Sequence, residues 1–116
     1  MTGSADGSVR LWLRLEGLSV LVVATYLYAQ GGHSWVLFAV LFLVPDVSFA
    51  GYLAGPRIGA IVYNLAHSYV GPLLLAVAAL ATGTTVAWPL VWAAHIGFDR
   101  ALGYGLKYPT AFGDTH

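Results

Sequence analysis

Five ionisable side chains lie within long apolar stretches of the sequence, and their types are those that bind divalent metals. They are Glu16, Asp46, His67, His95 and Asp99. Imidazole nitrogens and carboxylate oxygens are ligands of zinc, and manganese takes the same groups at higher coordination number. His95 and Asp99 stand four residues apart, which puts both on one face of a helix. We therefore expect zinc or manganese to be bound by two histidines and two aspartates: Asp46, His67, His95 and Asp99.

The same residues suggest a hydrolytic or an acid–base reaction. A bound divalent metal lowers the pKa of its water to about 7 and so supplies a nucleophile. Glu16 would act as the general base, or Asp99 where it is not a ligand. Without a metal, Asp46 or Asp99 would be a buried, protonated acid, so the catalytic candidates are Glu16, Asp46 and Asp99. We expect substrate binding from four polar residues near them: Asn64, Arg100, Tyr104 and Lys107.

The composition places these residues in a membrane. Of the 116 residues, 59% are hydrophobic and only 9% are charged, whereas soluble domains carry about a quarter charged residues. The mean hydropathy of +0.76 agrees. This composition excludes a soluble domain and a disordered chain, and a balanced charge excludes a nucleic-acid binder. The absence of cysteine excludes disulfides, thiolate zinc sites and thiol catalysis.

Four segments are long and apolar enough to cross a bilayer, which takes about 20 residues. They cover residues 11–29, 34–54, 57–81 and 85–106. Short breaks with turn chemistry separate them. The expected fold is therefore an all-α integral membrane four-helix bundle over residues 10–108, with a flexible tail at 1–9 and a C-terminal tail at 109–116.

Positive charges predict the orientation of these spans. Arg10, Arg14, Arg57 and Lys107 all fall on one side of a four-span chain, and the other two loops contain no lysine or arginine. Basic loops stay in the cytoplasm, so we expect a multi-pass protein of the inner (plasma) membrane with both termini cytoplasmic. The five ionisable groups then lie roughly 7–17 Å from the cytoplasmic ends of their spans. A single polar layer contributed by four helices indicates a functional site.

Two prolines are expected to break helices at membrane depth. Pro45 lacks an amide hydrogen and should leave the carbonyl of Leu41 without its helical partner. Gly71-Pro72 should free the carbonyl of Ser68 in the same way. Broken backbone of this kind is tolerated in a membrane where it lines a cavity or is buried in protein.

Several motifs along the chain resemble a known family. They are Pro45-Asp46, Gly51-Tyr52, Tyr63-Asn64, His67, the block from His95 to Arg100, and Gly103-Tyr104-Gly105. Together they resemble the bacterial domain-of-unknown-function family 4260, which implies a small four-helix membrane protein and no established activity. The Pro45-Asp46 step, His67-Ser68 and the His95–Asp99 pair are also similar to the LexA-regulated, membrane-bound metal-dependent hydrolases. That resemblance implies a metal-dependent hydrolase.

Other functions stay open at this point. The enzyme interpretation predicts a lipidic or amphipathic substrate. A small proton-coupled transporter would work as a homodimer around Glu16, and a non-metal enzyme would carry out acid–base chemistry on an isoprenoid or other lipid. A structural accessory subunit would use the polar layer only to fix helix packing, with Glu16 paired to Arg14 and Asp99 to Arg100. Beyond the lipid bilayer, the expected partners are further copies of the chain and no nucleic acid.

Overall fold

The computed structural model describes residues 7–104, and within that range every regular element is a helix. The elements are α1 (Gly7–Gln30), α2 (Trp35–Leu43), the 3₁₀ helix η1 (Val44–Ala54), α3 (Pro56–His67), α4 (Val70–Thr82) and α5 (Ala87–Leu102). The expected all-α class is confirmed. Residues 7–9, which we expected in a flexible tail, belong to α1, while the C-terminal tail 109–116 lies outside the described residues.

The helices differ in their ability to cross a membrane. Two stretches are long and apolar enough, Gly7–Gln30 and the combined Trp35–Ala54, and a third results if α3 and α4 count as one span bent by 46°. α5 has 16 residues, or about 24 Å of helix, which is short of the roughly 30 Å hydrocarbon core of a bilayer. Residues 7–104 thus contain two or three helices able to span a membrane, where the sequence predicted four spans.

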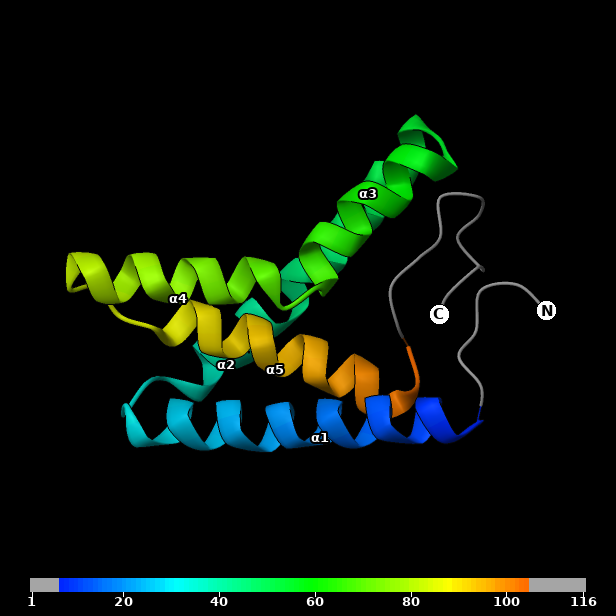
Figure 1. Cartoon of the computed structure of the whole chain (residues 1–116). Helices are drawn as coiled ribbons and strands as arrows, with labels where there is room; N and C mark the ends of the chain where they lie inside the picture. Colours follow the sequence, from blue (N-terminus) through cyan, green and yellow to red (C-terminus); the bar gives the residue numbers. More distant parts are fainter. Residues whose placement is uncertain (1–6, 105–116) are drawn as a thin grey trace.

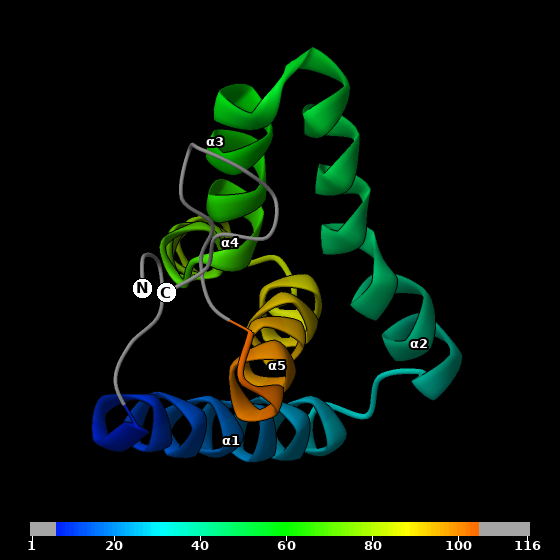
Figure 2. The same cartoon turned by 90° about the vertical axis from the view of Figure 1, so that its right-hand side faces the viewer.

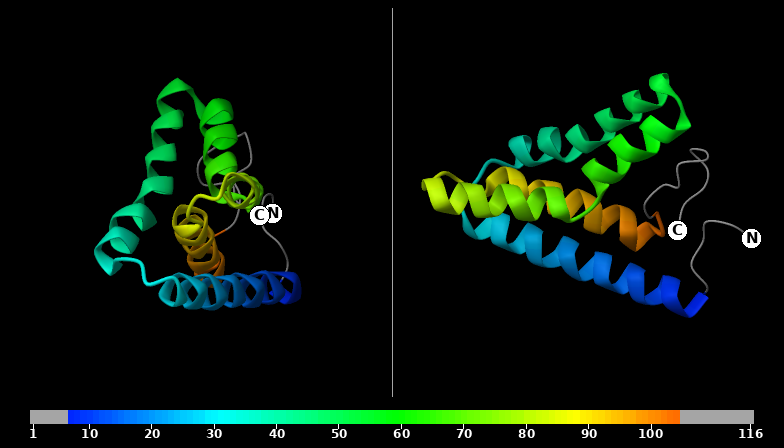
Figure 3. Two further views of the ribbon diagram at one scale, coloured as in Figure 1. Left: turned by 90° about the vertical axis from the view of Figure 1, so that its left-hand side faces the viewer. Right: turned by 45° about the horizontal axis from the view of Figure 1, so that its top comes forward.

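The described helices are not arranged as a bundle of four straight rods. α5 lies antiparallel against α1, and α4 lies beside α5 (Figure 1); we call these three helices the body. η1 and α3 form a hairpin, which we call the arm (Val44–His67), and the arm tilts away from the body (Figures 2 and 3). The start of α1 and the end of α5 lie at the same end of the molecule (Figure 1).

The body is held together by close contact between α1 and α5. Gly17 on α1 faces Gly97 on α5, and a Cβ atom added to Gly97 would lie 2.7 Å from the amide nitrogen of Leu21. A Cβ atom on Gly17 would likewise lie 2.8 Å from the carbonyl oxygen of Gly97. Small residues are the usual means of helix contact in lipid, where van der Waals packing replaces the hydrophobic effect. The two glycines therefore let the two backbones touch.

The arm uses the same device between its own two helices. A Cβ atom on Gly51 of η1 would lie 2.8 Å from the Cβ of Val62 on α3, and one on Gly59 of α3 would overlap the ring of Tyr52 on η1. Each helix of the arm thus offers a glycine to a large side chain of the other. Gly55, which joins them, has φ of 110°, a conformation that a side chain disfavours.

Both predicted helix breaks are present, with one correction. The carbonyl of Leu41 is not left without a partner, because the amide of Val44 donates to it. This i to i+3 bond is the 3₁₀ pattern, and η1 continues with it from the proline onward. The second break falls at Ser68, which is extended (φ −100°, ψ 154°) and ends α3, while Pro72 lies in the first turn of α4.

Candidate metal centre

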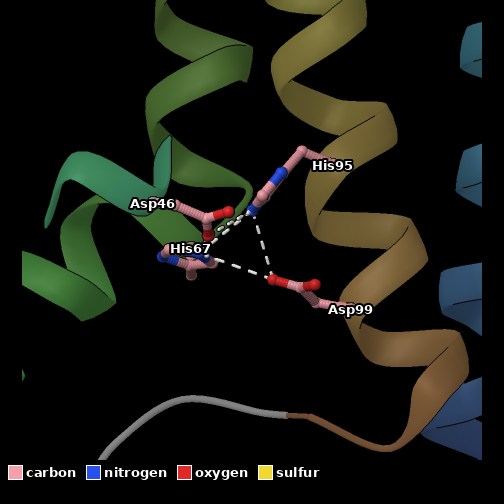
Figure 4. Close-up of side chains that lie close together, drawn as sticks. All are labelled: Asp46, His67, His95 and Asp99. Carbon is pink, nitrogen blue, oxygen red and sulfur yellow. Dashed lines mark hydrogen bonds and ion pairs between the residues drawn. The ribbon is translucent and has the colours of Figure 1, made fainter. Parts of the chain in front are cut away.

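The four residues expected to bind a metal converge on one point (Figure 4). Asp46 comes from the first turn of η1, His67 is the last residue of α3, and α5 supplies both His95 and Asp99. One ligating atom from each of the four lies within 4.8 Å of all the others. Among residues 7–104, these four form the one group of histidine and acidic side chains that is close enough to hold a shared ion.

The distances between these atoms are close to those of a tetrahedral site. Nε2 of His95 lies 3.3 Å from Oδ1 of Asp46 and 3.2 Å from Oδ2 of Asp99. Nε2 of His67 lies 3.7 and 3.4 Å from the same two oxygens, and the two Nε2 atoms are 3.2 Å apart. Ligand atoms bound to zinc at about 2.0–2.1 Å are separated by about 3.3–3.4 Å in a tetrahedron. Four of these five separations thus fit one ion bound to all four residues, and the fifth, 3.7 Å, is slightly longer.

A backbone hydrogen bond fixes which nitrogen of His67 faces the cluster. Nδ1 of His67 lies 3.0 Å from the carbonyl oxygen of Tyr63. A carbonyl only accepts, so Nδ1 carries the hydrogen and Nε2 of the neutral ring presents a lone pair. The Tyr63 ring stacks on the imidazole at 3.9 Å and 7°, which holds its plane. Metal-binding histidines usually donate their other nitrogen in this manner.

The electrostatics of the cluster favour a positive charge. The residues His67 and His95 are 3% and 2% exposed, and the side chains of Asp99 and Asp46 are 20% and 45% exposed. Two carboxylates and the lone pair of His67 converge at this point, while Arg100 bonds to the His67 carbonyl. A single proton would bridge one pair of atoms, whereas a divalent cation would neutralise both carboxylates and contact all four ligands. The donor set therefore fits a divalent metal.

The ligands are positioned by the two helix breaks and by one regular helix. Because η1 begins at Val44 and Pro45 is its second residue, Asp46 lies in the first turn of the tightened helix that continues α2. His67 lies where α3 ends before the extended Ser68. On α5, the i, i+4 spacing of His95 and Asp99 is enough to align them. Phe42 packs edge-on against the His95 ring at 4.9 Å, which limits its rotation.

Two side chains of α5 satisfy the carbonyls exposed by the break after α3. The indole nitrogen of Trp92 donates to the carbonyl of Ala66, and Nη2 of Arg100 donates to the carbonyl of His67 at 3.2 Å. Unpaired carbonyls would be costly at membrane depth. Together the two bonds tie the end of α3, which carries the ligand His67, to α5. No pattern in the sequence pointed to Trp92, since its partner is a backbone atom 26 residues away.

The remaining candidate residues lie outside the cluster. Glu16 is exposed on α1 and does not belong to the group of four. Asn64 is half-buried on α3, one turn before His67, and Tyr104 is 56% exposed just beyond α5. Arg100 lies behind His67 rather than among the ligands. Lys107, the fourth residue expected to bind substrate, lies outside the described residues.

Fold and site together define a class of protein: all-helical, with helices able to cross a membrane and a buried cluster of two histidines and two aspartates. The chain belongs to the family described as a domain of unknown function (DUF4260), whose model matches residues 10–116. This confirms the family resemblance of its motifs. No curated protein and no solved structure matches the chain.

Proposed function

We propose that this protein is a metal-dependent, hydrolase-like membrane enzyme acting on a lipidic or amphipathic substrate. The observation that carries the proposal is the convergence of Asp46, His67, His95 and Asp99 at separations of 3.2–3.7 Å. Four candidate ligands come from three helices and meet at one point. Costly polar groups of this kind mark functional sites in membrane proteins. The donor set suits zinc, and also manganese with further ligands from water or substrate.

The four side chains would have different roles, according to how exposed each one is. A divalent ion bound here would polarise a substrate oxygen and activate water. Four protein ligands fill a tetrahedral site, so one of them would have to give way to water, and the more buried His67, His95 and Asp99 would hold the ion. The Asp46 side chain is 45% exposed, so it would be the ligand that water replaces and would then accept a proton from that water. Glu16, first considered as the base, is exposed on α1 outside this group.

The surroundings of the site favour a substrate that is dissolved in the bilayer. Large apolar side chains are exposed close to Asp46 in the chain: Leu43 ends α2 and Val47 follows Asp46 on η1. A water-soluble substrate would meet these apolar side chains beside the exposed carboxylate. An ester or phosphoester of a lipid would instead bring its polar group to the metal and keep its chain in the membrane.

The membrane placement is part of the proposal. Arg10 and Arg14 lie near the start of α1 and Arg57 lies near the start of α3. With basic ends in the cytoplasm, the protein would be a multi-pass inner-membrane protein with cytoplasmic termini and its site toward that side. A second copy of the chain is the expected protein partner, because exposed apolar faces remain on the arm.

Metal analysis of the purified protein tests the proposal. We expect near-stoichiometric zinc or manganese in the wild type, and loss of the ion in His67→Ala and His95→Ala. His33→Ala is the matched control, since His33 lies between α1 and α2 and outside the cluster. Wild-type protein that stays empty after dialysis against either metal would overturn the metal site.

Activity separates the enzyme from the other candidates. Hydrolysis of fluorogenic fatty-acyl esters or phosphoesters in mixed micelles should require the metal and should be lost in Asp46→Asn. Activity that persists under chelation but needs Asp46 would favour metal-free acid–base chemistry. Proton-coupled uptake into vesicles that depends on Glu16 would favour transport, and loss of partner association alone would favour an accessory subunit.

A further inference from the structure

Pro45 frees a different backbone carbonyl from the one that a regular α-helix would expose. In an α-helix, the missing amide hydrogen of residue 45 would leave the carbonyl of Leu41 unpaired. Here the amide of Val44 donates to Leu41, and η1 continues in this i to i+3 register. The partner due to the Phe42 carbonyl in this register is residue 45, which has no amide hydrogen. The 3₁₀ register thus provides no backbone donor for the carbonyl of Phe42.

This carbonyl lies beside a ligand of the candidate metal centre. Nδ1 of His95 is buried and makes no hydrogen bond of standard geometry to the described residues. The backbone of Phe42 is close enough to the His95 ring to act on it as a hydrogen-bonding group, and the Phe42 ring packs against the same imidazole at 4.9 Å. A buried nitrogen and a freed carbonyl oxygen therefore lie near each other. Buried groups of either kind are rarely left unpaired in proteins.

The cluster requires a hydrogen on Nδ1 of His95. Nε2 of this ring faces the cluster, 3.2 Å from Oδ2 of Asp99 and 3.3 Å from Oδ1 of Asp46. A neutral imidazole has one nitrogen with a hydrogen and one with a lone pair. A shared ion needs the lone pair on Nε2, so the hydrogen belongs on Nδ1, where a carbonyl can accept it. His67 already has this arrangement, with Nδ1 3.0 Å from the carbonyl oxygen of Tyr63.

We propose that Pro45 is a positioning residue for the ligand His95. Because residue 45 has no amide hydrogen to give, the Phe42 carbonyl accepts the hydrogen of Nδ1 of His95, and the lone pair of Nε2 stays directed at the ion. This role differs from the placement of Asp46, which depends on the path of η1. The inference rests on the metal site of the proposed function and holds whatever reaction that site carries out.

Nuclear magnetic resonance of the zinc-free protein tests the bond directly. Histidine labelled with ¹⁵N shows whether Nδ1 of His95 carries a hydrogen and how fast that hydrogen exchanges with water, and the signal is assigned by its loss in His95→Ala. We expect a bound, protected hydrogen in the wild type. Pro45→Ala supplies the Phe42 carbonyl with an amide, from residue 45 in a 3₁₀ helix or from residue 46 in an α-helix. Exchange at Nδ1 should then be about threefold faster, because a carbonyl has two lone pairs and the new amide weakens the bond without replacing it.

Two controls separate the missing hydrogen from the proline ring. Pro72→Ala adds an amide in the first turn of α4, where amides have no partner within the helix, and should change nothing at His95. Lactic acid in place of Pro45, introduced by nonsense suppression, removes the ring without adding an N–H group. Zinc affinity, measured by competition with a fluorescent chelator, should fall a few-fold in Pro45→Ala and keep the wild-type value in the lactic-acid protein. Exchange at Nδ1 of His67 should be the same in the wild type and in Pro45→Ala.

The proposal is overturned if Nδ1 of His95 carries no hydrogen in the zinc-free wild type, or if its exchange rate is the same in Pro45→Ala. An equal loss of zinc affinity in Pro45→Ala and in the lactic-acid protein would assign the effect to the proline ring and would overturn it as well. A wild-type protein that takes up no zinc would instead contradict the metal site. The exchange measurement needs no zinc, so it still decides whether Pro45 leaves the Phe42 carbonyl to His95.

Discussion

The body and the arm are held in place by different kinds of contact. In the body, α1 and α5 touch along their length, with Gly17 against Gly97 at the crossing. The two helices of the arm pack closely against each other through Gly51 and Gly59. The arm contacts the body mainly at its base, where η1 begins and α3 ends. At those ends lie the two arm ligands, Asp46 and His67, facing the two ligands on α5 (Figure 4).

This difference indicates which contacts depend on an ion. Van der Waals packing between the body helices needs no cofactor, because it comes from the shapes of two backbones. The arm is joined to α5 by polar contacts: the four-residue cluster and the bonds from Trp92 and Arg100. Without a cation, the convergent carboxylates repel each other. A metal would thus complete the cluster and also fix the angle of the arm.

The largest expected effect is on the arm when the metal is removed. His95→Ala should lower metal affinity on the order of 100-fold or more, since even groups that only support a ligand contribute 10–100-fold. The chain has no cysteine, so spin labels can be placed at will. The distance between labels at Leu53, near the tip of the arm, and Leu102 on α5 should broaden in His95→Ala or on chelation.

A label pair within the body serves as the control. Tyr26 on α1 and Leu102 on α5 are both exposed, and their separation should stay narrow with and without metal. Equal broadening of both pairs would mean that the ion stabilises the whole protein and that the distinction between arm and body is wrong.

The second effect concerns the body alone. Gly97→Leu inserts a side chain where a Cβ would lie 2.7 Å from the backbone of α1. We expect the free energy of unfolding to fall by about 1–3 kcal/mol, the usual cost of overpacking, as measured by SDS titration in mixed micelles. Gly7→Leu is the control, because a Cβ on Gly7 has open space around it. A Gly97→Leu protein as stable as this control would contradict the close backbone contact.

A smaller effect is expected from the bond that joins Trp92 to the end of α3. Trp92→Phe removes the donor to the Ala66 carbonyl and keeps an aromatic ring against Gly71. Metal affinity should fall by roughly tenfold, as for other supporting hydrogen bonds around metal ligands. Isothermal titration with zinc measures it. Trp88→Phe, which alters the ring stacked on Trp92, should leave affinity unchanged, and equal losses in both variants would remove the special role of Trp92.

The smallest effect is expected at the start of the arm. Pro45→Ala restores an amide hydrogen and lets α2 continue as an α-helix past Val44. Asp46 would then rotate away from its present position, but a single-residue backbone change can be absorbed over the following turns. We expect a loss of metal affinity of a few-fold and little change in stability. A continuous helix with unaltered metal affinity would show that η1 is not needed to place Asp46.

The sequence predicted the four residues of the cluster because an ionisable side chain within an apolar segment costs free energy. Asp46, His67, His95 and Asp99 interrupt apolar stretches, and only the last two have a spacing that fixes their relation. Glu16 met the same criterion and yet lies on the outside of α1. Depth along a helix is visible in the sequence, whereas the direction in which a helix turns its side chains depends on its neighbours.

The paths of the helices were harder to foresee than the residues that interrupt them. Pro45 and Pro72 marked the two breaks correctly, but the sequence did not say that the first continues as a 3₁₀ helix or that the second bends the chain by 46°. Both outcomes depend on which groups donate hydrogen bonds to the backbone carbonyls that each break exposes. Val44 supplies the partner for Leu41, and two side chains from α5 supply partners for the end of α3.

The sequence by itself determined the helical class, the family, the long apolar segments and the four residues that form the cluster. These follow from local properties, namely the hydrophobicity of each segment, the cost of each buried charge and the motifs along the chain. Only the tertiary structure decided that three helices bring the histidine and aspartate atoms within 3.2–3.7 Å of each other, that the arm tilts from the body, and that Arg100 lies over the Tyr69 ring. Such distances depend on contacts between residues far apart in the chain, which no local pattern encodes.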